Sequence, residues 1–218
     1  MGFLVNVSKK SLDEVEMYLD IAVNNIIEGK VIAFPTNSVY GLGCDPTNMD
    51  AVDRLYQIKF RDRSKGFLLL VFDIQEAEKI AIFNETARRL ANHFWPGELS
   101  LILKRKQDNI IPPEVTSSEE TIGLRVPKNE IVREILNKLT ERGEFGGIVG
   151  TSANYAGEAP CESGKEISNK ILSPIDFIID SGKIKSGTPT TIVDCTSSEI
   201  KILREGKIEK DEILQVLS

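Results

Sequence analysis

Apolar residues recur along this chain with two different spacings, which predict helices and strands in turn. Between Ser11 and Gly29 they return every three or four residues, as they do on one face of a helix. Ser11 and Glu14 form a capping box for that helix, and Gly29 ends it. Short continuous apolar runs at 31–34 and 67–72 are instead typical of buried strands.

The same patterns extend to the rest of the chain. Further helices are expected at Asp50–Lys59, Ile74–Ile82, Glu85–Phe94, Ile131–Leu139 and Lys210–Leu217. Further strands are expected at Ser100–Leu103, Thr121–Val126, Gly146–Asn154 (where the strand runs into a turn of small residues), Phe177–Ile179, Thr191–Val193 and Ile200–Leu203. Segments 35–43 and 105–120 are predicted loops, the second polar and mobile. Strands alternating with helices indicate an α/β fold. Because no Pro/Gly/Ser linker divides the chain, a single domain over residues 1–218 is predicted.

Composition is that of an ordinary globular protein. The chain has 218 residues, of which 41% are hydrophobic, enough for a buried core. No apolar run reaches the roughly 18 residues that a membrane helix needs. The segment Met1–Val7 is too short and too polar for a signal peptide. We therefore expect a cytoplasmic protein without a membrane partner.

Histidine and cysteine are too few for several common catalytic mechanisms. The only histidine, His93, follows an apolar helical pattern and is expected to have a structural role. The three cysteines, at positions 44, 161 and 195, lie far apart, which argues against a disulfide framework or a thiolate zinc site. Chemistry should therefore depend on lysine, arginine, serine, threonine and backbone amides, with no metal ligand set.

Positive charge is concentrated in one short segment, although the whole chain has a formal net charge of −6. The segment contains Arg54, Lys59, Arg61, Arg63 and Lys65. Dense like charge resists burial, so one interpretation is a solvated loop after a helix. The other is an anion site, in which lysine acts as a point charge and arginine as a bidentate donor.

The sequence lacks the Walker motif of nucleotide-binding proteins and the complete nucleophile elbow of hydrolases. No Gly-Lys pair is followed by the Ser or Thr of a Walker motif. The segment Gly150–Asn154 resembles a nucleophile elbow, but asparagine stands where the last glycine is due.

Six short motifs occur in order along the chain, namely Pro35–Leu42, Lys59–Arg61, Trp95–Ser100, Gly123–Pro127, Thr151–Asn154 and Leu203–Gly206. Taken together they resemble the YrdC-type family, the threonylcarbamoyl-adenylate synthases, and the resemblance covers about Ile26 to Lys207. It implies an open, twisted mixed sheet with flanking helices and a large, basic cavity. It also implies that ATP, L-threonine and bicarbonate are condensed into threonylcarbamoyl-AMP and pyrophosphate, with Mg²⁺ accompanying ATP. In the family a separate transferase then moves the threonylcarbamoyl group onto tRNA.

The resemblance also assigns site residues. The expected catalytic residues are Lys59 and Arg61. The expected ATP-binding residues are Lys59, Arg63, Lys65, Thr121, Ser152, Asn154 and Arg204. The expected threonine-binding residues are Thr36, Arg125 and Thr190, with Arg125 as a carboxylate clamp. Thr36 and Ser152 could alternatively cap turns, and Trp95–Gly97 is interpreted as scaffold.

This chain departs from the family pattern at three places. The family usually has Lys-Pro where this chain has Lys65-Gly66, which predicts a more mobile loop. It usually has Ser-Thr in place of Thr190-Thr191, and it often has Thr in place of Ser100.

Two other functions remain open from the sequence. One is a paralogue of the same fold with different carbamoyl-adenylate chemistry, which threonine dependence would distinguish. The other is a double-stranded RNA-binding module, or at least a surface that contacts RNA, which predicts steep salt dependence. The acidic net charge counts against RNA binding as the main role.

Overall fold

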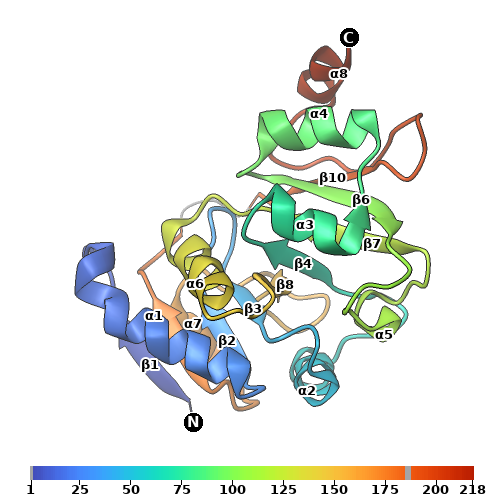
Figure 1. The fold of residues 1–218 in the computed structure, drawn as a ribbon. Helices are drawn as coiled ribbons and strands as arrows, with labels where there is room; N and C mark the ends of the chain where they lie inside the picture. Colours follow the sequence, from blue (N-terminus) through green and yellow to red (C-terminus); the bar gives the residue numbers. More distant parts are fainter. Residues whose placement is uncertain (1, 185–187) are drawn as a thin grey trace.

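The computed structural model describes residues 2–184 and 188–218, and these form one mixed sheet of eleven strands with helices packed against it (Figure 1). The strands are β1 (Phe3–Asn6), β2 (Ile32–Phe34), β3 (Gly41–Gly43), β4 (Leu68–Val71), β5 (Ala81–Ile82), β6 (Leu99–Arg105), β7 (Thr121–Arg125), β8 (Gly147–Ser152), β9 (Phe177–Asp180), β10 (Thr191–Asp194) and β11 (Lys201–Arg204). The helices are α1 (Leu12–Ile27), α2 (Met49–Lys59), α3 (Ile74–Ile80), α4 (Glu85–Phe94), α5 (Pro113–Thr116), α6 (Glu130–Glu141), α7 (Gly164–Lys170) and α8 (Lys210–Leu217).

The strand order mixes early and late parts of the chain. It runs β1-β9-β2-β3-β8-β4-β7-β6-β10-β11, and β5 pairs with β6 beside this path. The pairs β1/β9, β2/β9, β4/β7 and β6/β10 are parallel, whereas the other pairs are antiparallel. The single-domain α/β fold with a mixed sheet and flanking helices is therefore confirmed.

The sheet has a different hydrophobic core on each face, because successive side chains of a strand point to opposite sides. Ala33, Leu69, Val149 and Ile178 belong to one core, together with residues of α2, α3, α4, α7 and α8. Their neighbours Phe34, Leu70, Ile148 and Ile179 belong to the other core, together with α1 and α6. The short strands therefore read as continuous apolar runs because both of their faces are covered.

The second face carries helices over only part of its width. Helices α1 and α6 lie side by side and contribute to the core over β1, β9, β2 and the neighbouring residues Leu70 and Ile148 (Figure 1). Farther along, β6 and β10 place Leu101 and Val193 in the first core. Their alternate residues, such as Ser100, face the side that α1 and α6 leave uncovered. A cavity lies there, and it is described below.

Three expectations about local structure are wrong. Segment 41–43, expected within a loop, is strand β3, which pairs with both β2 and β8. The helix expected at 74–82 ends at Ile80, and the next two residues form β5. The segment 105–120 contains the short helix α5. Strand β1 and helix α7 were not expected from the pattern of apolar residues.

Arg105 holds the segment that follows β6. Its guanidinium is buried and donates to Ile111 O at 2.5 Å and to Thr116 Oγ1 at 2.5 Å. The Ser117 hydroxyl in turn donates to Arg63 O, so this segment packs against the basic loop. A Cβ on Gly66 would lie 2.0 Å from Thr116 O, which explains why glycine stands there. Because Gly66 has no side chain, the basic loop can pack closely against the segment that contains Thr116.

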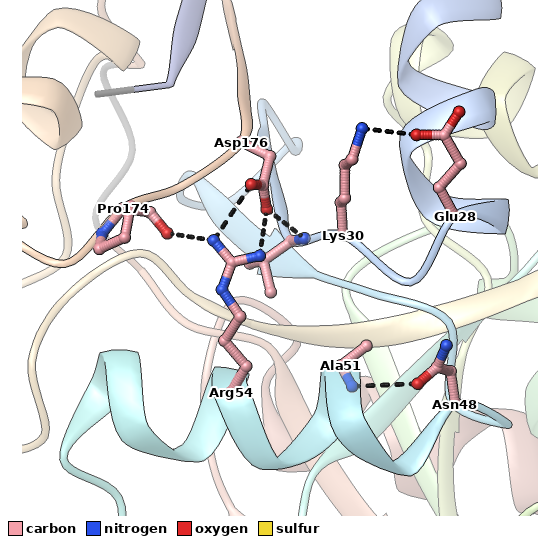
Figure 2. A network of polar contacts seen from close by, with 8 residues as sticks. Glu28, Lys30, Asn48, Ala51, Arg54, Pro174 and Asp176 are labelled. Atoms are coloured by element: carbon pink, nitrogen blue, oxygen red, sulfur yellow. Dashed lines mark hydrogen bonds and ion pairs between the residues drawn. The ribbon is translucent and has the colours of Figure 1, made fainter.

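Arg54, a member of the basic segment, has a structural role (Figure 2). Its guanidinium donates to both carboxylate oxygens of Asp176, at 2.6 and 3.1 Å, and to Pro174 O at 2.7 Å. Asp176 also accepts from Val31 N at 2.9 Å. Helix α2 is thus fastened to the starts of two neighbouring strands, β2 and β9.

In the part of the chain that the structure describes, no helix combines the length and the apolar character needed to cross a lipid bilayer.

Candidate functional site

A cavity of about 710 Å³ lies against the uncovered part of the second sheet face. Its floor is formed by Leu68, Leu70, Ser100, Arg125, Gly150, Ser152 and Ile192, which all have the same strand parity as the α1/α6 core. Loops at the ends of β2, β8 and α2 and before β10 complete the wall. Its volume is within the range of small-molecule sites, about 300–1,000 Å³.

The charged residues that line the cavity are mostly cations. They are Arg61, Lys65, Arg125 and Arg204, and the one acidic residue among the described lining is Glu158. The cavity is therefore electropositive although the whole chain has a formal net charge of −6. Clefts lined by one sign of charge concentrate ligands of the opposite sign.

Arg125 is a buried cation whose hydrogen-bond partners are all uncharged. Its Nε donates to Gly97 O at 2.9 Å, Nη2 to Asn37 Oδ1 at 2.6 Å and Nη1 to Ser38 Oγ at 3.3 Å. Burial lowers the pKa of Arg125 to about 10, an effect that the nearby Glu98 partly offsets. A guanidinium has five N–H donors, so some remain available on the cavity side. A ligand carboxylate would supply the missing negative charge.

The turn after β2 presents hydroxyl groups beside Arg125. Thr36 Oγ1 accepts from Ser38 N at 3.1 Å and Val39 N at 3.2 Å, and donates to Val39 O at 2.5 Å. Thr36 therefore caps this turn, which was the alternative role predicted for it from the sequence. It also lines the cavity. The Ser38 hydroxyl lines the cavity as well and contacts Arg125.

Thr190 and Arg204 are directly bonded at another part of the wall. Arg204 donates from Nε and Nη2 to Thr190 O, at 3.0 and 2.8 Å, and from Nη2 to Thr190 Oγ1 at 3.1 Å. Ser100 Oγ lies 3.0 Å from Thr190 Oγ1. These three side chains come from β11, from the residue before β10 and from β6, and all three line the cavity.

Arg61 and Lys65 bring the basic loop to the cavity. Arg61 Nε donates to Lys65 O at 2.7 Å and Nη2 to Gly66 O at 2.9 Å, so the loop folds around the guanidinium. The same group lies over the Phe67 ring, 5.1 Å from its centroid. These contacts hold Arg61 in one orientation.

Lys59 lies behind the cavity wall. It is 2% exposed, and its ammonium donates to Ser152 O and, at 2.8 Å, to Asn154 O. Ala156 N also donates to Lys59 O at 2.9 Å. Lys59 therefore fastens the turn after β8 to the end of α2, and it is not among the described residues that line the cavity.

Replacing Lys59 should remove a pH dependence of stability. Burial, and secondarily Arg61, lowers the pKa of Lys59 to about 7 in the folded protein. Between that value and the unfolded value of about 10.4, the unfolded chain binds more protons at this site than the folded chain. The contribution of Lys59 to the free energy of unfolding therefore rises with pH across that window, by at most about 1.4 kcal/mol per pH unit.

Chemical denaturation of wild type and Lys59→Met from pH 6.5 to 9.5 checks this. The free energy of unfolding of wild type minus that of Lys59→Met should increase with pH. Lys165→Met, which removes an exposed lysine, is the matched control. A flat difference for Lys59→Met would contradict the assignment.

Ser152 and Asn154 belong to the turn that Lys59 holds, and both line the cavity. Asn154 Nδ2 donates to Tyr155 O at 2.7 Å and to Glu158 O at 2.9 Å. Its Oδ1 is buried and has no hydrogen-bond partner among residues 2–184 and 188–218. An acceptor of this kind suits a ligand with N–H or O–H donors.

Besides Lys59, two further predicted ATP-binding residues lie outside the described cavity lining. Arg63 is exposed, pairs with Asp53 at 2.7 Å and lies over the Tyr56 ring. Thr121 Oγ1 donates to Ser118 Oγ at 2.8 Å. Neither is among the described cavity-lining residues, whereas Thr36, Arg61, Lys65, Arg125, Ser152, Asn154, Thr190 and Arg204 are.

Ser38 and Ser100 were not among the predicted site residues, although both line the cavity. For Ser100 a signal existed, since it is the one polar residue in the apolar run Leu99–Leu103. A strand residue of opposite character to its neighbours points to a face with a different environment.

Comparison with known proteins gives consistent matches. The family model Sua5_yciO_yrdC, described as Telomere recombination, matches residues 24–206. A threonylcarbamoyl-AMP synthase of Pyrococcus abyssi is 31% identical over 218 residues, which are 100% of this chain and 61% of the relative. A putative threonylcarbamoyl-AMP synthase of Methanocaldococcus jannaschii is 31% identical over 205 residues, 94% of this chain and 93% of the relative.

The fold of a solved structure agrees with these matches. The crystal structure of P. abyssi Sua5 complexed with L-threonine has a TM-score of 0.89 at 31% identity and covers 99% of this chain and 61% of that one. This chain thus spans about three fifths of the P. abyssi protein and nearly the whole of the M. jannaschii relative.

Proposed function

Because the chain belongs to the Sua5/YrdC family, we propose that it condenses ATP, L-threonine and bicarbonate into threonylcarbamoyl-AMP and pyrophosphate. The product would supply the threonylcarbamoyl group for modification of tRNA. The observation that carries this proposal is Arg125, a buried guanidinium with uncharged partners on the wall of a cavity of about 710 Å³. Such a group is suited to bind the carboxylate of an amino acid.

The lining residues can be divided into a part of the cavity that binds threonine and a part that binds ATP. The threonine carboxylate would bind Arg125, near Thr36, with Thr190 contacting the same substrate. The triphosphate would bind Arg61 and Lys65. The turn that contains Ser152 and Asn154 would contact the nucleoside, where Asn154 Oδ1, which has no hydrogen-bond partner in the described part of the chain, can accept from it. Arg204, which also lines the cavity, would contact the nucleotide as well.

The chemistry requires positioning and charge stabilisation more than proton transfer by the protein. The amine of threonine and bicarbonate combine into a carbamate with loss of water. A carbamate oxygen then attacks the α-phosphorus, and the bond from that phosphorus to the bridging oxygen breaks as pyrophosphate leaves. Arg61 and Lys65 would stabilise the negative charge that develops on pyrophosphate. No step needs a histidine.

Mg²⁺ is proposed as a companion of ATP. No cluster of three or more metal-ligating side chains occurs in the described ranges 2–184 and 188–218, and Glu158 is the one carboxylate of the described lining. The residues therefore suit an ion held mainly by phosphate oxygens and water, as Mg²⁺ commonly is. When bound, it would offset phosphate charge.

The proposed product determines which macromolecules this protein would work with. Threonylcarbamoyl-AMP would pass to a separate tRNA threonylcarbamoyl transferase, and the basic residues that line the cavity would also contact RNA. We place this function in the cytoplasm, where ATP and tRNA are available.

The test incubates the purified chain with ATP, L-threonine, bicarbonate, Mg²⁺ and unmodified tRNA, and identifies products by mass spectrometry. Threonylcarbamoyl-AMP and pyrophosphate should appear while the mass of the tRNA stays unchanged. Adenylate formation that does not require threonine would favour the paralogue with other carbamoyl-adenylate chemistry. Absence of any adenylate would contradict the proposal.

A further inference from the structure

Two buried hydroxyl groups meet in the cavity wall. Ser100 of β6 is 0% exposed and Thr190, just before β10, is 6% exposed. The parallel register of β6 and β10 pairs Ser100 with Ile192, two residues after Thr190, so Ser100 and Thr190 lie on the same face of the sheet. Their oxygens are 3.0 Å apart.

Arg204 limits how the two hydroxyl hydrogens can be arranged. A guanidinium only donates, so Thr190 Oγ1 must accept from Arg204 Nη2, at 3.1 Å. Thr190 then has one lone pair and one hydrogen left. Either Ser100 donates to that lone pair, or Thr190 donates to Ser100.

Burial decides between these arrangements. Thr190 is the hydrogen-bond partner that the structure gives to the Ser100 hydroxyl within residues 2–184 and 188–218. Both residues line the cavity, but Ser100 is 0% exposed and Thr190 is 6% exposed. If Thr190 donated, the Ser100 hydrogen would therefore have neither a partner among the described residues nor access to solvent, at a cost of about 1–3 kcal/mol. If Ser100 donates, both hydrogens are accommodated, because the Thr190 hydrogen is free to point into the cavity that Thr190 lines.

We propose that Ser100 is a positioning residue that acts through Thr190. Together with Arg204 it occupies both lone pairs of the Thr190 oxygen, so that Thr190 presents a hydrogen-bond donor to the bound ligand. The ligand group that suits this donor is an oxygen acceptor of the amino-acid substrate, either its side-chain hydroxyl or its carboxylate. This inference rests on the proposed function for the identity of that substrate.

The test is a double-mutant cycle measured by calorimetric titration of L-threonine into the purified chain. Thr190→Val should weaken binding by about tenfold or more, and Ser100→Ala by about fivefold, since each removes one net hydrogen-bond contribution. The variant with both changes should bind no more weakly than Thr190→Val alone, because Ser100 has nothing left to orient. ATP affinity of Ser100→Ala should stay within about twofold of wild type.

A second ligand separates the two acceptor groups. L-2-aminobutyrate keeps the carboxylate of threonine but lacks its hydroxyl. If Thr190 contacts the hydroxyl, Ser100→Ala should leave binding of L-2-aminobutyrate unchanged; if it contacts the carboxylate, both ligands should lose affinity equally.

Unchanged threonine binding in Ser100→Ala would overturn the inference, as would losses that multiply in the double variant, since these indicate a separate structural role. If Ser100→Ala does not fold, Ser100→Cys keeps the volume, replaces the hydroxyl with a weak donor and should show the same pattern. If the wild-type chain makes the adenylate but the losses of the two single variants multiply in the double variant, only this inference is contradicted. A wild-type chain that binds no threonine contradicts the proposed function as well.

Discussion

Arg125→Met should weaken binding of L-threonine by about a hundredfold and leave affinity for ATP within about twofold. Removing one member of a buried, hydrogen-bonded charge pair costs about 2–5 kcal/mol, and a hundredfold corresponds to about 2.7 kcal/mol. Among residues 2–184 and 188–218 Arg125 hydrogen-bonds to no charged group, so the whole of this loss should appear when the carboxylate binds. Separate calorimetric titrations of threonine and ATP measure both effects.

Arg133→Met is the matched control for Arg125. Arg133 also contacts a backbone carbonyl, Phe72 O at 3.2 Å, and lies over the Phe72 ring, but it is not among the described cavity-lining residues. It should bind both ligands as wild type does. An equal loss of threonine and ATP in Arg125→Met would place Arg125 between the two ligands and would contradict its assignment as a carboxylate clamp.

Arg61→Met should lower kcat by about a hundredfold. Removing a preorganised donor aimed at developing charge costs about 3 kcal/mol. Arg61 Nη1 makes no hydrogen bond to any residue in the described part of the chain, while Nε and Nη2 are held by the loop. That nitrogen is therefore available to a phosphate. Initial rates of pyrophosphate release at saturating substrates measure kcat.

Arg63→Met, two residues away, removes the same charge from the same loop. Arg63 is exposed and its ion pair with Asp53 is of the kind that contributes about 0–1 kcal/mol to stability. Its kcat should stay within about threefold of wild type. If both variants lost activity equally, net charge of the loop would matter rather than the placement of Arg61, and the assignment would be wrong.

The basic segment illustrates what could be predicted from the sequence and what could not. Its concentration of charge predicted an anion site, and two of its residues, Arg61 and Lys65, line the cavity. Arg54, Arg61 and Arg63 nevertheless have three different environments. Arg54 bonds the carboxylate of Asp176 just before β9, Arg61 lines the cavity and Arg63 forms an ion pair on the surface. These partners are distant in sequence or depend on helix orientation, so charge alone could not separate the three.

For Lys59 the necessary signal was present in the helical pattern. Val52, Leu55 and Tyr56 of α2 are buried, and the spacing of three or four residues continues to Lys59. A lysine on the buried side of a helix must bring its own partners, here the two backbone carbonyls after β8. The sequence could thus predict burial of Lys59 but not which carbonyls it would meet.

Strand β3 escaped prediction because its residues have low strand propensity. Two of its three residues are glycines, which are depleted in strands. The structure needs them because a Cβ on Gly43 would lie 2.3 Å from Val149 O, and one on Gly41 would lie 2.8 Å from the Phe34 ring. Such close approach depends on which strands become neighbours, and that information is not local.

During synthesis β1 and β2 leave the ribosome long before β9, the strand that lies between them in the sheet. A shorter delay separates β6 from its neighbour β10. At roughly 5–20 residues per second, the stretch from Phe34 to Phe177 takes about 7–29 seconds to add, and β2 must wait that long for β9. A nascent chain that has not reached β9 therefore carries Ile32–Phe34 as an apolar strand with one unpaired edge. Edges of this kind pair with other chains, so the interval before residue 177 is when this protein is most exposed to aggregation.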